Sequence, residues 1–308
     1  MDRFEEMRIF VQVSERRSFT DAAEDLQLPR ATVTNAIKRL EQRLGTRLLE
    51  RTTRVVTPTL DGQAHYGRCI ALLSGLEEAE SAFHAAAPRG LLRVNLQPTL
   101  AATFVVPRLP DFLARFPEID LHMGEGDRLV DLVREGVDCV LRAGEPHDSS
   151  MVARRVALLE QVTVASPAYL ARHGEPATPS DLAGHVAVNY ISSATGKPYP
   201  FDFTIEGDSR FITLPSRVSV GGAETYAAAC IAGLGLAQVP RYRIRRELEQ
   251  GLLKVVLGAM PPKPLPVSVL YPHSRQLSPR VRLFADWLRE VFDDQLADPP
   301  QPSGAGTA

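Results

Sequence analysis

The first quarter of the chain spaces its apolar residues as helices do. The positions that predict a first helix are Phe4, Met7, Ile9, Phe10 and Val13. Ser18 can cap a second, short helix, and Pro29 separates it from a third. The third helix is predicted from about Arg30 to Leu44, where Gly45 stops it. Its buried face is expected to comprise Val33, Ile37, Leu40 and Leu44.

Two further patterns follow the third helix. Apolar pairs at 48–49 and 55–56 flank the polar run from Arg51 to Arg54, which predicts a small β-wing. A long helix is then predicted from Pro58 to about Ala87. Because no nearby domain covers its apolar seam, we expect two copies of this helix to pair. The expected dimer contacts are Tyr66, Ile70, Leu73, Leu76 and Phe83.

Beyond Leu91 the pattern changes, and short β-branched or Leu-rich runs alternate with helical segments. The predicted strands are 91–96, 119–123, 137–141, 162–165, 186–189, 218–220, 236–239 and 267–270, with helices at 100–116 and 224–232 among them. This alternation predicts parallel sheets covered by helices, in about 200 residues that suffice for two α/β lobes. We expect the organisation 1–57, 58–90 and 91–298, with a disordered tail at 299–308.

The charge distribution singles out residues 28–57. The whole chain has 35 Lys and Arg against 37 Asp and Glu, a formal net charge of −2. Within 28–57 there are seven basic and two acidic residues, a balance of +5, so the rest carries −7. A short basic module on an acidic body favours a nucleic-acid partner.

The third helix supplies the side chains for such a partner. The residues expected on its exposed face are Arg30, Thr32, Thr34, Asn35, Lys38 and Arg39. Two helices joined by a tight turn, with such a second helix, are typical of a helix-turn-helix that enters the major groove of double-stranded DNA. Arg51 and Arg54 on the wing are expected to reach phosphates or a minor groove. The alternative is a basic face that only contacts solvent.

Residues 18–62, SFTDAAEDLQLPRATVTNAIKRLEQRLGTRLLERTTRVVTPTLDG, closely resemble the winged helix-turn-helix of the LysR-type transcriptional regulators. Later runs resemble that family's effector domain, particularly in regulators of metabolic operons: RAGEP (142–146), SPAYL (166–170), AGLGLAQVP (232–240) and LSPRVRLFADWL (277–288). The resemblance implies an all-α winged helix-turn-helix with a long linker helix, then a two-lobed α/β domain like a periplasmic binding protein. Lobe 1 is expected at 91–161 and 267–298, and lobe 2 at 162–266.

The same resemblance implies a function. We expect a cytoplasmic bacterial regulator that binds an operator and has no enzymatic activity. A small-molecule effector between the lobes is expected to modulate its DNA binding or its contact with RNA polymerase. It also implies a dimer of dimers. An effector domain that only dimerises, without a ligand, is the alternative.

Three positions depart from the family's usual pattern. Pro29 and Arg30 stand where Ser or Thr commonly caps the recognition helix and Gln or Pro follows. Asn35 stands where Arg is frequent. We expect an unchanged fold and a different operator preference, since the groove-facing side chains differ.

The expected effector site lies at strand ends and helix starts that face the cleft, where backbone N–H groups favour anions. The candidates are Thr99, Leu100, Thr103, Arg142, Ser192, Gly221, Gly222, Ala223 and Pro240. Arg142 can pair a carboxylate, or alternatively form a salt bridge to Glu145 or Asp127. Gly221 and Gly222 permit close approach of a ligand, or form only a flexible turn. We expect a small organic acid or polar metabolite.

Other chemistries find little support. Cys69, Cys139 and Cys230 lack metal-ligand or CxxC spacing, and we interpret Cys139 and Cys230 as core residues rather than a redox pair. The histidines lack metal-site spacing, so no metal or other cofactor is expected, and His65 and His147 are expected at the surface. Nucleotide-loop and nucleophile-elbow motifs are missing, which disfavours an enzyme. With no signal-peptide pattern and no apolar run long enough for a bilayer, neither a secreted receptor nor a membrane protein is expected.

Overall fold

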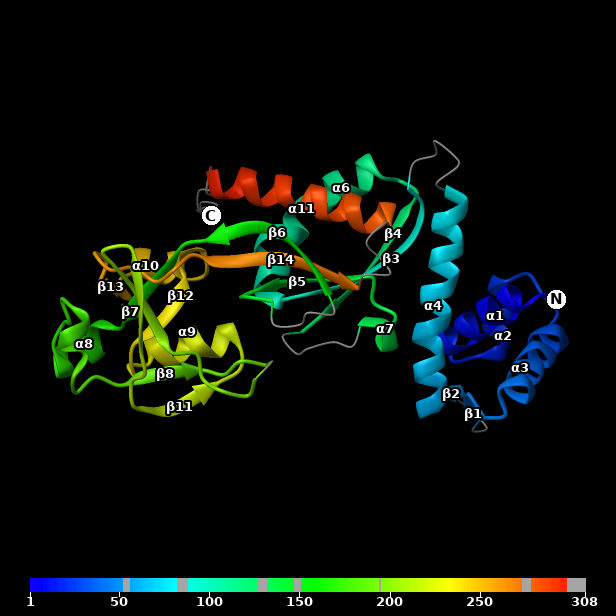
Figure 1. Ribbon diagram of the computed structural model, residues 1–308, viewed down its shortest axis with the longest axis horizontal. Coiled ribbons are helices and arrows are strands. Elements are labelled where there is room, and N and C mark those ends of the chain that lie inside the picture. Colours follow the sequence, from blue (N-terminus) through cyan, green and yellow to red (C-terminus); the bar gives the residue numbers. More distant parts are fainter. Residues whose placement is uncertain are drawn as a thin grey trace, which may run out of the picture.

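The computed structural model describes residues 1–51, 56–81, 88–126, 132–146, 151–193, 195–272 and 278–297. These residues form an elongated molecule in which a helical head, a linker helix and two α/β lobes follow one another (Figure 1). We call residues 1–58 the head. Lobe 1 is built on a five-stranded sheet, and lobe 2 carries the remaining, smaller sheets. No helix in the described ranges is both long and apolar enough to cross a membrane.

The head contains three helices and a hairpin: α1 (Arg3–Arg16), α2 (Phe19–Asp25), α3 (Arg30–Leu44), β1 (Leu49–Arg51) and β2 (Val56–Pro58). Ser18 caps α2 as predicted, because its hydroxyl accepts a hydrogen bond of 3.3 Å from the backbone N–H of Asp21. The two strands pair antiparallel and form the wing. Leu44 was expected in the core but is 40% exposed, since it lies in the last turn of α3, beyond the buried residues that end with Leu40.

The linker helix α4 (Leu60–Ser81) begins two residues later than predicted, and residues 82–87 of the predicted helix lie outside the described part. It stands between the head and lobe 1 in Figure 1. On the head side it packs against α1, and Cys69 and Ile70 belong to the buried core of the head. On the other side it lies against α7 (Leu132–Glu135) of lobe 1.

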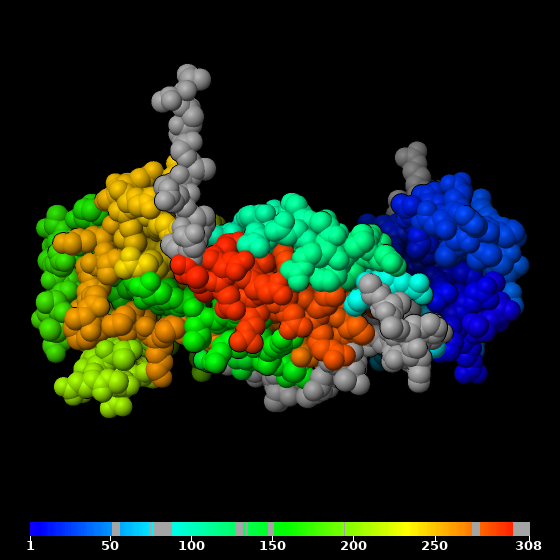
Figure 2. Space-filling model, turned by 90° about the horizontal axis from the view of Figure 1, so that it is seen from above, coloured from blue at the N-terminus to red at the C-terminus, as the bar shows by residue number. Residues whose placement is uncertain are grey.

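Lobe 1 is a sheet in the order β4-β3-β5-β14-β6, covered on one face by helices. Its strands are β3 (Gly90–Leu96), β4 (Ile119–Glu125), β5 (Cys139–Ala143), β6 (Met151–Leu159) and β14 (Leu265–Pro272). Its other helical elements are α5 (Pro98–Leu100), η1 (Ala101–Val105), η2 (Val106–Arg108), α6 (Leu109–Arg115) and α11 (Pro279–Ala297). Figure 2 shows α6 and α11 side by side on one face. Phe112, Phe284 and Trp287 join these two helices in the core, with rings 4.8–5.6 Å apart.

Lobe 2 consists of short sheets and helices between the two crossovers. Its strands are β7 (Gln161–Ala165), β8 (Ala187–Tyr190), β9 (Phe201–Ile205), β10 (Asp208–Ile212), β11 (Ser216–Val220), β12 (Ala237–Pro240) and β13 (Lys254–Val256). Its helices are α8 (Pro167–His173), η3 (Pro179–Leu182), α9 (Ala223–Ile231), η4 (Arg241–Ile244) and α10 (Arg245–Glu249). The sheets are β12-β7-β13, β11-β8 and the hairpin β10-β9.

The sheets are less uniform than the strand–helix alternation predicts. β3 runs parallel to β4 and β5, as expected, but β14 is antiparallel to both β5 and β6. Strands β6, β9, β10 and β13 were not predicted. The single helix expected over 100–116 is a series of short turns of different pitch, because Pro107 and Pro110 lack the N–H that a continuous α-helix requires.

The chain passes between the lobes twice. The first crossover joins β6 to β7 at Glu160, and the second joins β13 to β14, where Lys263 lies. The Gln161 side chain donates a 2.8 Å hydrogen bond to the Lys263 carbonyl, which ties the two crossovers together. The sequence predicts the boundaries between the lobes at 161/162 and 266/267. In the structure β6 ends at Leu159, β7 begins at Gln161 and β14 begins at Leu265.

Candidate DNA-binding and effector sites

Helix α3 presents its polar side chains outward. Arg30, Asn35, Lys38 and Arg39 are exposed, and Thr32 and Thr34 border them on the same helix. The opposite face is anchored by Val33, Ile37 and Leu40, each 0% exposed. This contrast follows from helical spacing alone, since residues three and four apart share a face. The predicted polar groups are therefore held by a rigid helix whose own core contacts fix its rotation.

Charged contacts also fix α3 against its neighbours. Arg43 binds the carboxylate of Glu6 at 2.8 Å, and Glu6 is only 7% exposed. Glu41 accepts hydrogen bonds from the backbone N–H groups of Leu48 and Leu49, at 2.9 and 3.1 Å, where the wing begins. The wing position is thus set by a side chain of α3.

The start of α3 lacks a side-chain cap among the described residues, as expected from the proline at this position. Pro29 occupies the N-cap position with φ −59°, and no side-chain oxygen caps the helix. The carbonyl of Pro29 still accepts from the N–H groups of Thr32 and Val33. The first turn of α3, beside the exposed Arg30, therefore has no capping side chain among the described residues.

The described residues include only part of the wing. Arg51 ends β1, and its side chain lies outside the described part. Arg54 lies outside the described residues altogether.

The predicted dimer seam of α4 is largely used within the chain. Ile70 is 7% exposed in the core of the head, and Leu73 packs against the same core. The hydroxyl of Tyr66 donates a 2.7 Å hydrogen bond to Glu15 of α1. Leu76 is half-buried, and Phe83 lies outside the described residues. Tyr66 and Ile70 therefore do not form the free surface that was expected, because α1 and α7 flank α4.

His65, expected at the surface, is half-buried. Its ring packs on Phe10, with centroids 5.4 Å apart, and its Nε2 is buried without a hydrogen-bond partner among the described residues. Burial, followed by the nearby Arg43 and Arg68, lowers the pKa of His65. His147, also expected at the surface, lies outside the described residues.

In lobe 1, Arg142 is oriented by Asn95. Its guanidinium donates to the Asn95 carbonyl at 3.1 Å and to the Asn95 side-chain oxygen at 2.5 Å. Next to it, the N–H of Ala143 donates to the Gln97 side chain at 3.0 Å. These bonds join the ends of the parallel strands β3 and β5. Asn95 is thus a partner of Arg142 that the sequence did not predict. Of the two salt-bridge partners considered for Arg142, Glu145 and Asp127, the latter lies outside the described residues.

Thr99 lies where the lobes meet. The hydroxyl of Tyr242, from lobe 2, donates a 3.3 Å hydrogen bond to the Thr99 hydroxyl, and its ring contacts Phe104 at 4.8 Å. The neighbouring Arg241 pairs with Glu160 of the first crossover at 2.9 Å. The segment after Pro240 therefore connects lobe 2 to both the crossover and Thr99.

The other lobe 1 and lobe 2 candidates differ in accessibility. Thr103 is exposed, whereas Leu100 is 0% exposed in the core of lobe 1. Leu100 was therefore wrongly proposed as a ligand contact, because the first turn after Pro98 points it into the core. Ser192 is 3% exposed and accepts a 3.2 Å hydrogen bond from the Tyr199 hydroxyl.

The glycines before α9 leave open space. Gly222 is the N-cap of α9, which begins at Ala223, and no side chain caps the helix among the described residues. A Cβ on Gly221 or Gly222 would meet no described atom within 4 Å. Neither glycine has the positive φ that requires glycine. The space beside these backbone groups is therefore available to another molecule.

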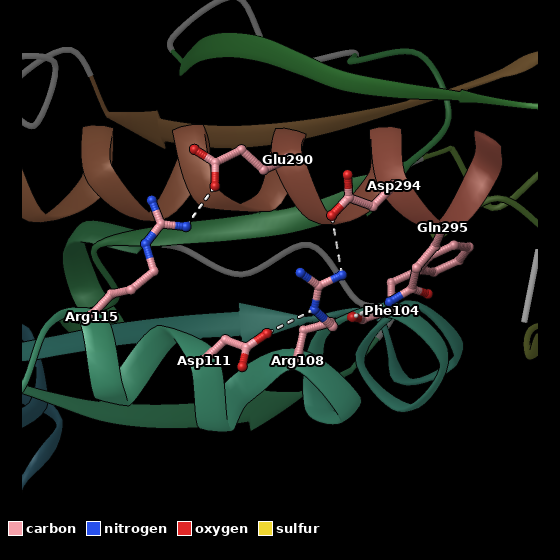
Figure 3. Close-up of polar contacts among 7 residues, drawn as sticks. All are labelled: Phe104, Arg108, Asp111, Arg115, Glu290, Asp294 and Gln295. Carbon is pink, nitrogen blue, oxygen red and sulfur yellow. Dashed lines mark hydrogen bonds and ion pairs between the residues drawn. The ribbon is translucent and has the colours of Figure 1, made fainter. Parts of the chain in front are cut away.

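Ion pairs hold the first helical segment of lobe 1 against α11 (Figure 3). Arg108 binds Asp111 at 3.1 Å and Asp294 at 3.3 Å, and Arg115 binds Glu290 at 2.6 Å. The side chain of Gln295 donates to the Phe104 carbonyl at 3.2 Å. These contacts position the segment that begins with Thr99. A nearby groove of about 350 Å³, lined by residues that include Arg115, Arg282 and Trp287, includes none of the predicted effector residues.

The cysteines are buried and unpaired, as expected for core residues. Burial raises the pKa of Cys230 to about 12 and that of Cys139 well above its ordinary value, so the reactive thiolate is disfavoured. Cys139 belongs to lobe 1 and Cys230 to lobe 2.

These sites define a class of protein: a winged helix-turn-helix joined by a long helix to a two-lobed α/β domain. Two family models match the chain. Residues 4–63 match the bacterial regulatory helix-turn-helix protein, lysR family, and residues 85–293 match the LysR substrate binding domain.

Similar proteins agree with these matches. An HTH-type transcriptional regulator of Escherichia coli K12, YhjC, is 38% identical over 96% of this chain and 100% of its own length. An HTH-type transcriptional repressor of Pseudomonas aeruginosa is 37% identical over 95% of this chain and 93% of its own. The solved structure of CrgA, a LysR-type regulator from Neisseria meningitidis, is 30% identical with a TM-score of 0.54, covering 93% of this chain and 97% of CrgA.

The chain therefore belongs to the LysR family of transcriptional regulators, with a helix-turn-helix DNA-binding domain and an effector-binding domain. The predicted fold class and regulatory function are confirmed. The family comprises regulators and not enzymes, so the enzyme alternative is rejected.

Several residues of these sites were missed by sequence reasoning. Asn95 and Gln97 occur in or just after a predicted strand, where alternation indicates only which face a residue takes. Tyr242 follows Pro240, but its partner Thr99 is 143 residues away. Only the polar character of these side chains in an otherwise apolar surrounding could have drawn attention to them.

Proposed function

We propose that this regulator reads its operator with Arg30, Thr32, Thr34, Asn35, Lys38 and Arg39 of α3, with Arg51 and Arg54 of the wing on the DNA backbone. The observation that carries this proposal is the contrast on α3 between exposed polar residues and the fully buried Val33, Ile37 and Leu40. The uncapped start of α3 adds N–H groups that suit a phosphate.

The DNA proposal is tested by fluorescence anisotropy. A labelled duplex from the region upstream of the protein's own gene is titrated at about 150 mM salt, with random duplex as competitor. Arg30→Ala is expected to reduce the preference for the operator by roughly tenfold, as for loss of a base contact. Arg54→Ala is expected to weaken binding to all sequences and to flatten the salt dependence.

A matched control is Arg246→Ala, which removes an exposed charge of lobe 2. It should bind both duplexes as the unmodified protein does. If Arg30→Ala and Arg54→Ala also behave like the unmodified protein on both duplexes, the assigned DNA face is wrong.

The effector is proposed to be a small organic acid that enters between the lobes. Arg142 would pair its carboxylate, Thr99, Thr103 and Ser192 would supply hydroxyls, and the backbone at Gly221, Gly222 and Ala223 would approach it closely, beside Pro240. The orientation of Arg142 by Asn95 and the open space at the two glycines support this arrangement.

A thermal-shift screen with a panel of mono- and dicarboxylates tests the effector site. A binding acid should raise the melting temperature of the unmodified protein. Arg142→Gln should abolish the rise, whereas Arg155→Gln, which alters an exposed residue of strand β6, should retain it. Equal shifts in both variants would exclude Arg142 from the site.

We further propose a dimer of dimers in the cytoplasm that contacts RNA polymerase. Since Tyr66 and Ile70 are used within the chain, the α4 pair is proposed to use the opposite side, where Leu72 is 52% exposed. The exposed Val106, Leu113 and Met123 of lobe 1 support pairing of effector domains. In light scattering, Leu72→Asp should disrupt the α4 pair, and Leu113→Asp should leave dimers.

A further inference from the structure

A polar cluster joins the head, the linker helix and lobe 1. Glu15 of α1 accepts a hydrogen bond from the Tyr66 hydroxyl of α4 at 2.7 Å, and it also pairs with the guanidinium of Arg93 on β3. The Arg93 side chain is 15% exposed and that of Glu15 is 32% exposed. This pair is therefore more shielded from solvent than the Arg115–Glu290 pair of lobe 1, whose side chains are 50% and 54% exposed.

The same contact is shaped by a glycine. Gly136, which follows α7, has φ +66° and is buried against α4. A Cβ at this position would come within 3.2 Å of the Tyr66 ring and 3.3 Å of the Ile70 side chain. Only glycine allows the turn and the close approach together. Lobe 1 therefore packs closely against the linker helix at this turn. Figure 1 shows α7 beside α4.

Two strands lead from this contact to the predicted effector site. The N–H of Arg93 donates to the Asp138 carboxylate at 2.8 Å, and the N–H of Asp138 donates to the Arg93 carbonyl at 2.8 Å. Gln97 lies four residues beyond Arg93, and Arg142 four residues beyond Asp138. There the backbone N–H of Gln97 donates to the Leu141 carbonyl, and Arg142 binds Asn95. At about 3.3 Å per residue, the two ends are roughly 13 Å apart.

We propose that Glu15, Tyr66 and Arg93 form a dock that holds the head on lobe 1 in one orientation, and that strands β3 and β5 pass the state of the interlobe junction to it. A ligand at the junction changes the population of the docked state only if it binds docked and undocked molecules differently. The dock itself is independent of the proposed function, whereas its control by an effector rests on it.

Hydrogen–deuterium exchange of the full chain, without DNA, tests the dock. Glu15→Gln and Arg93→Gln are each expected to speed exchange roughly fivefold to tenfold in peptides from α7 and the end of α1. The double variant should show little more than the larger single effect, because both changes remove the same interaction. Additive effects, or unchanged exchange in the single variants, would overturn the dock.

Two control variants are measured beside the Glu15→Gln and Arg93→Gln single and double variants. Arg115→Gln removes the ion pair with Glu290 within lobe 1 and should leave the α7 and α1 peptides unchanged. Gly136→Ala leaves every charge in place but pushes against Tyr66, so it should also speed exchange there. If Arg115→Gln has the same effect as Arg93→Gln, the change reflects general loosening of lobe 1 and the dock is rejected.

Transmission is tested with substitutions at the far end of the strands. Tyr242→Phe removes the hydroxyl bound to Thr99 with little change in packing, and Arg142→Gln removes the contact to Asn95. Both should alter exchange in the α7 and α1 peptides by twofold or more, and Arg155→Gln should not. Unchanged exchange in both variants would reject transmission. Loss of DNA binding by Arg30→Ala is measured separately, so failure of either proposal is distinguishable.

Discussion

The head and lobe 1 illustrate two ways of building a core. The core of the head, completed by α4, comes from one continuous segment between Ile9 and Ile70. Its polar supports include the hydrogen bond that the N–H of Leu48 donates to Glu41, seven residues away. Lobe 1 is completed only by β14 and α11, which return after the whole of lobe 2. A motif in a continuous segment can therefore identify the head, whereas the effector site depends on contacts between distant segments.

The largest expected effect comes from breaking the closure of lobe 1. Trp287 is 2% exposed and packs on Phe112. Trp287→Ala should cost lobe 1 about 3–5 kcal/mol, because it leaves a cavity at the junction of α6 and α11. In calorimetry the transition of lobe 1 should fall while that of the head stays near its original temperature. Leu296→Ala, at an exposed position of the same helix, should change little. Equal shifts in both transitions would show that the two cores are not independent.

A smaller effect is expected in the head at the Glu6–Arg43 pair. Arg43→Met leaves the buried Glu6 carboxylate without its partner and should cost about 1–2 kcal/mol, since Arg43 itself is partly exposed. Adding Glu6→Gln should recover part of the loss, because a neutral amide is easier to bury. Urea unfolding followed by exchange in α1 and α3 measures the change. This account would be contradicted if the double variant lost more unfolding free energy than the two single variants lose together.

The pH dependence of the head should depend on His65. Its pKa in the folded chain lies below the ordinary value of 6.5 because the ring is partly removed from water. As pH falls through 6.5, the unfolded chain gains a proton that the folded chain does not, so the head loses stability until the folded pKa is reached. His65→Phe should flatten this loss and add about 1 kcal/mol at low pH by removing the unpartnered Nε2.

Lobe 2 supplies the internal control for this pH series. Burial also lowers the pKa of His185, which the substitution leaves in place. The melting temperature of lobe 2 should therefore keep its dependence on pH in the variant. A head transition with the same pH dependence in the His65→Phe variant and in the unmodified protein would rule out His65 as its cause.

The smallest effect is expected at the turn between α2 and α3. Gln27 has φ +54°, a left-handed conformation that glycine adopts without strain. Gln27→Gly should stabilise the head by about 0.5–1 kcal/mol. Glu24→Gly, within α2, should destabilise it by a similar amount, since glycine weakens a helix interior. Melting of the head measures both, and a loss of stability in Gln27→Gly would show that its side chain contributes more than its backbone conformation costs.

The parts that could be predicted are those governed by local spacing. The three helices of the head, the Ser18 cap and the buried Val33, Ile37 and Leu40 follow from a repeat of three to four residues. Leu100 was misplaced because its polar neighbours suggested a ligand site, while its own direction is set by the turn after Pro98. The hairpin β9–β10 was missed although β9 alternates between apolar and polar residues, because its partner β10 does not.

The class of this protein could be recognised from the amino-acid order, because the DNA-binding segment is continuous and its apolar, polar and basic positions fall on separate faces of helices whose geometry is fixed. How those parts contact one another depends on the folded chain. Folding turned Tyr66 and Ile70 toward their own chain, packed the ring of His65 on Phe10, and brought Tyr242 to Thr99 and Glu15 to Arg93. Such pairs join residues that are far apart in the chain, and local periodicity contains no information about which distant surface a side chain will meet.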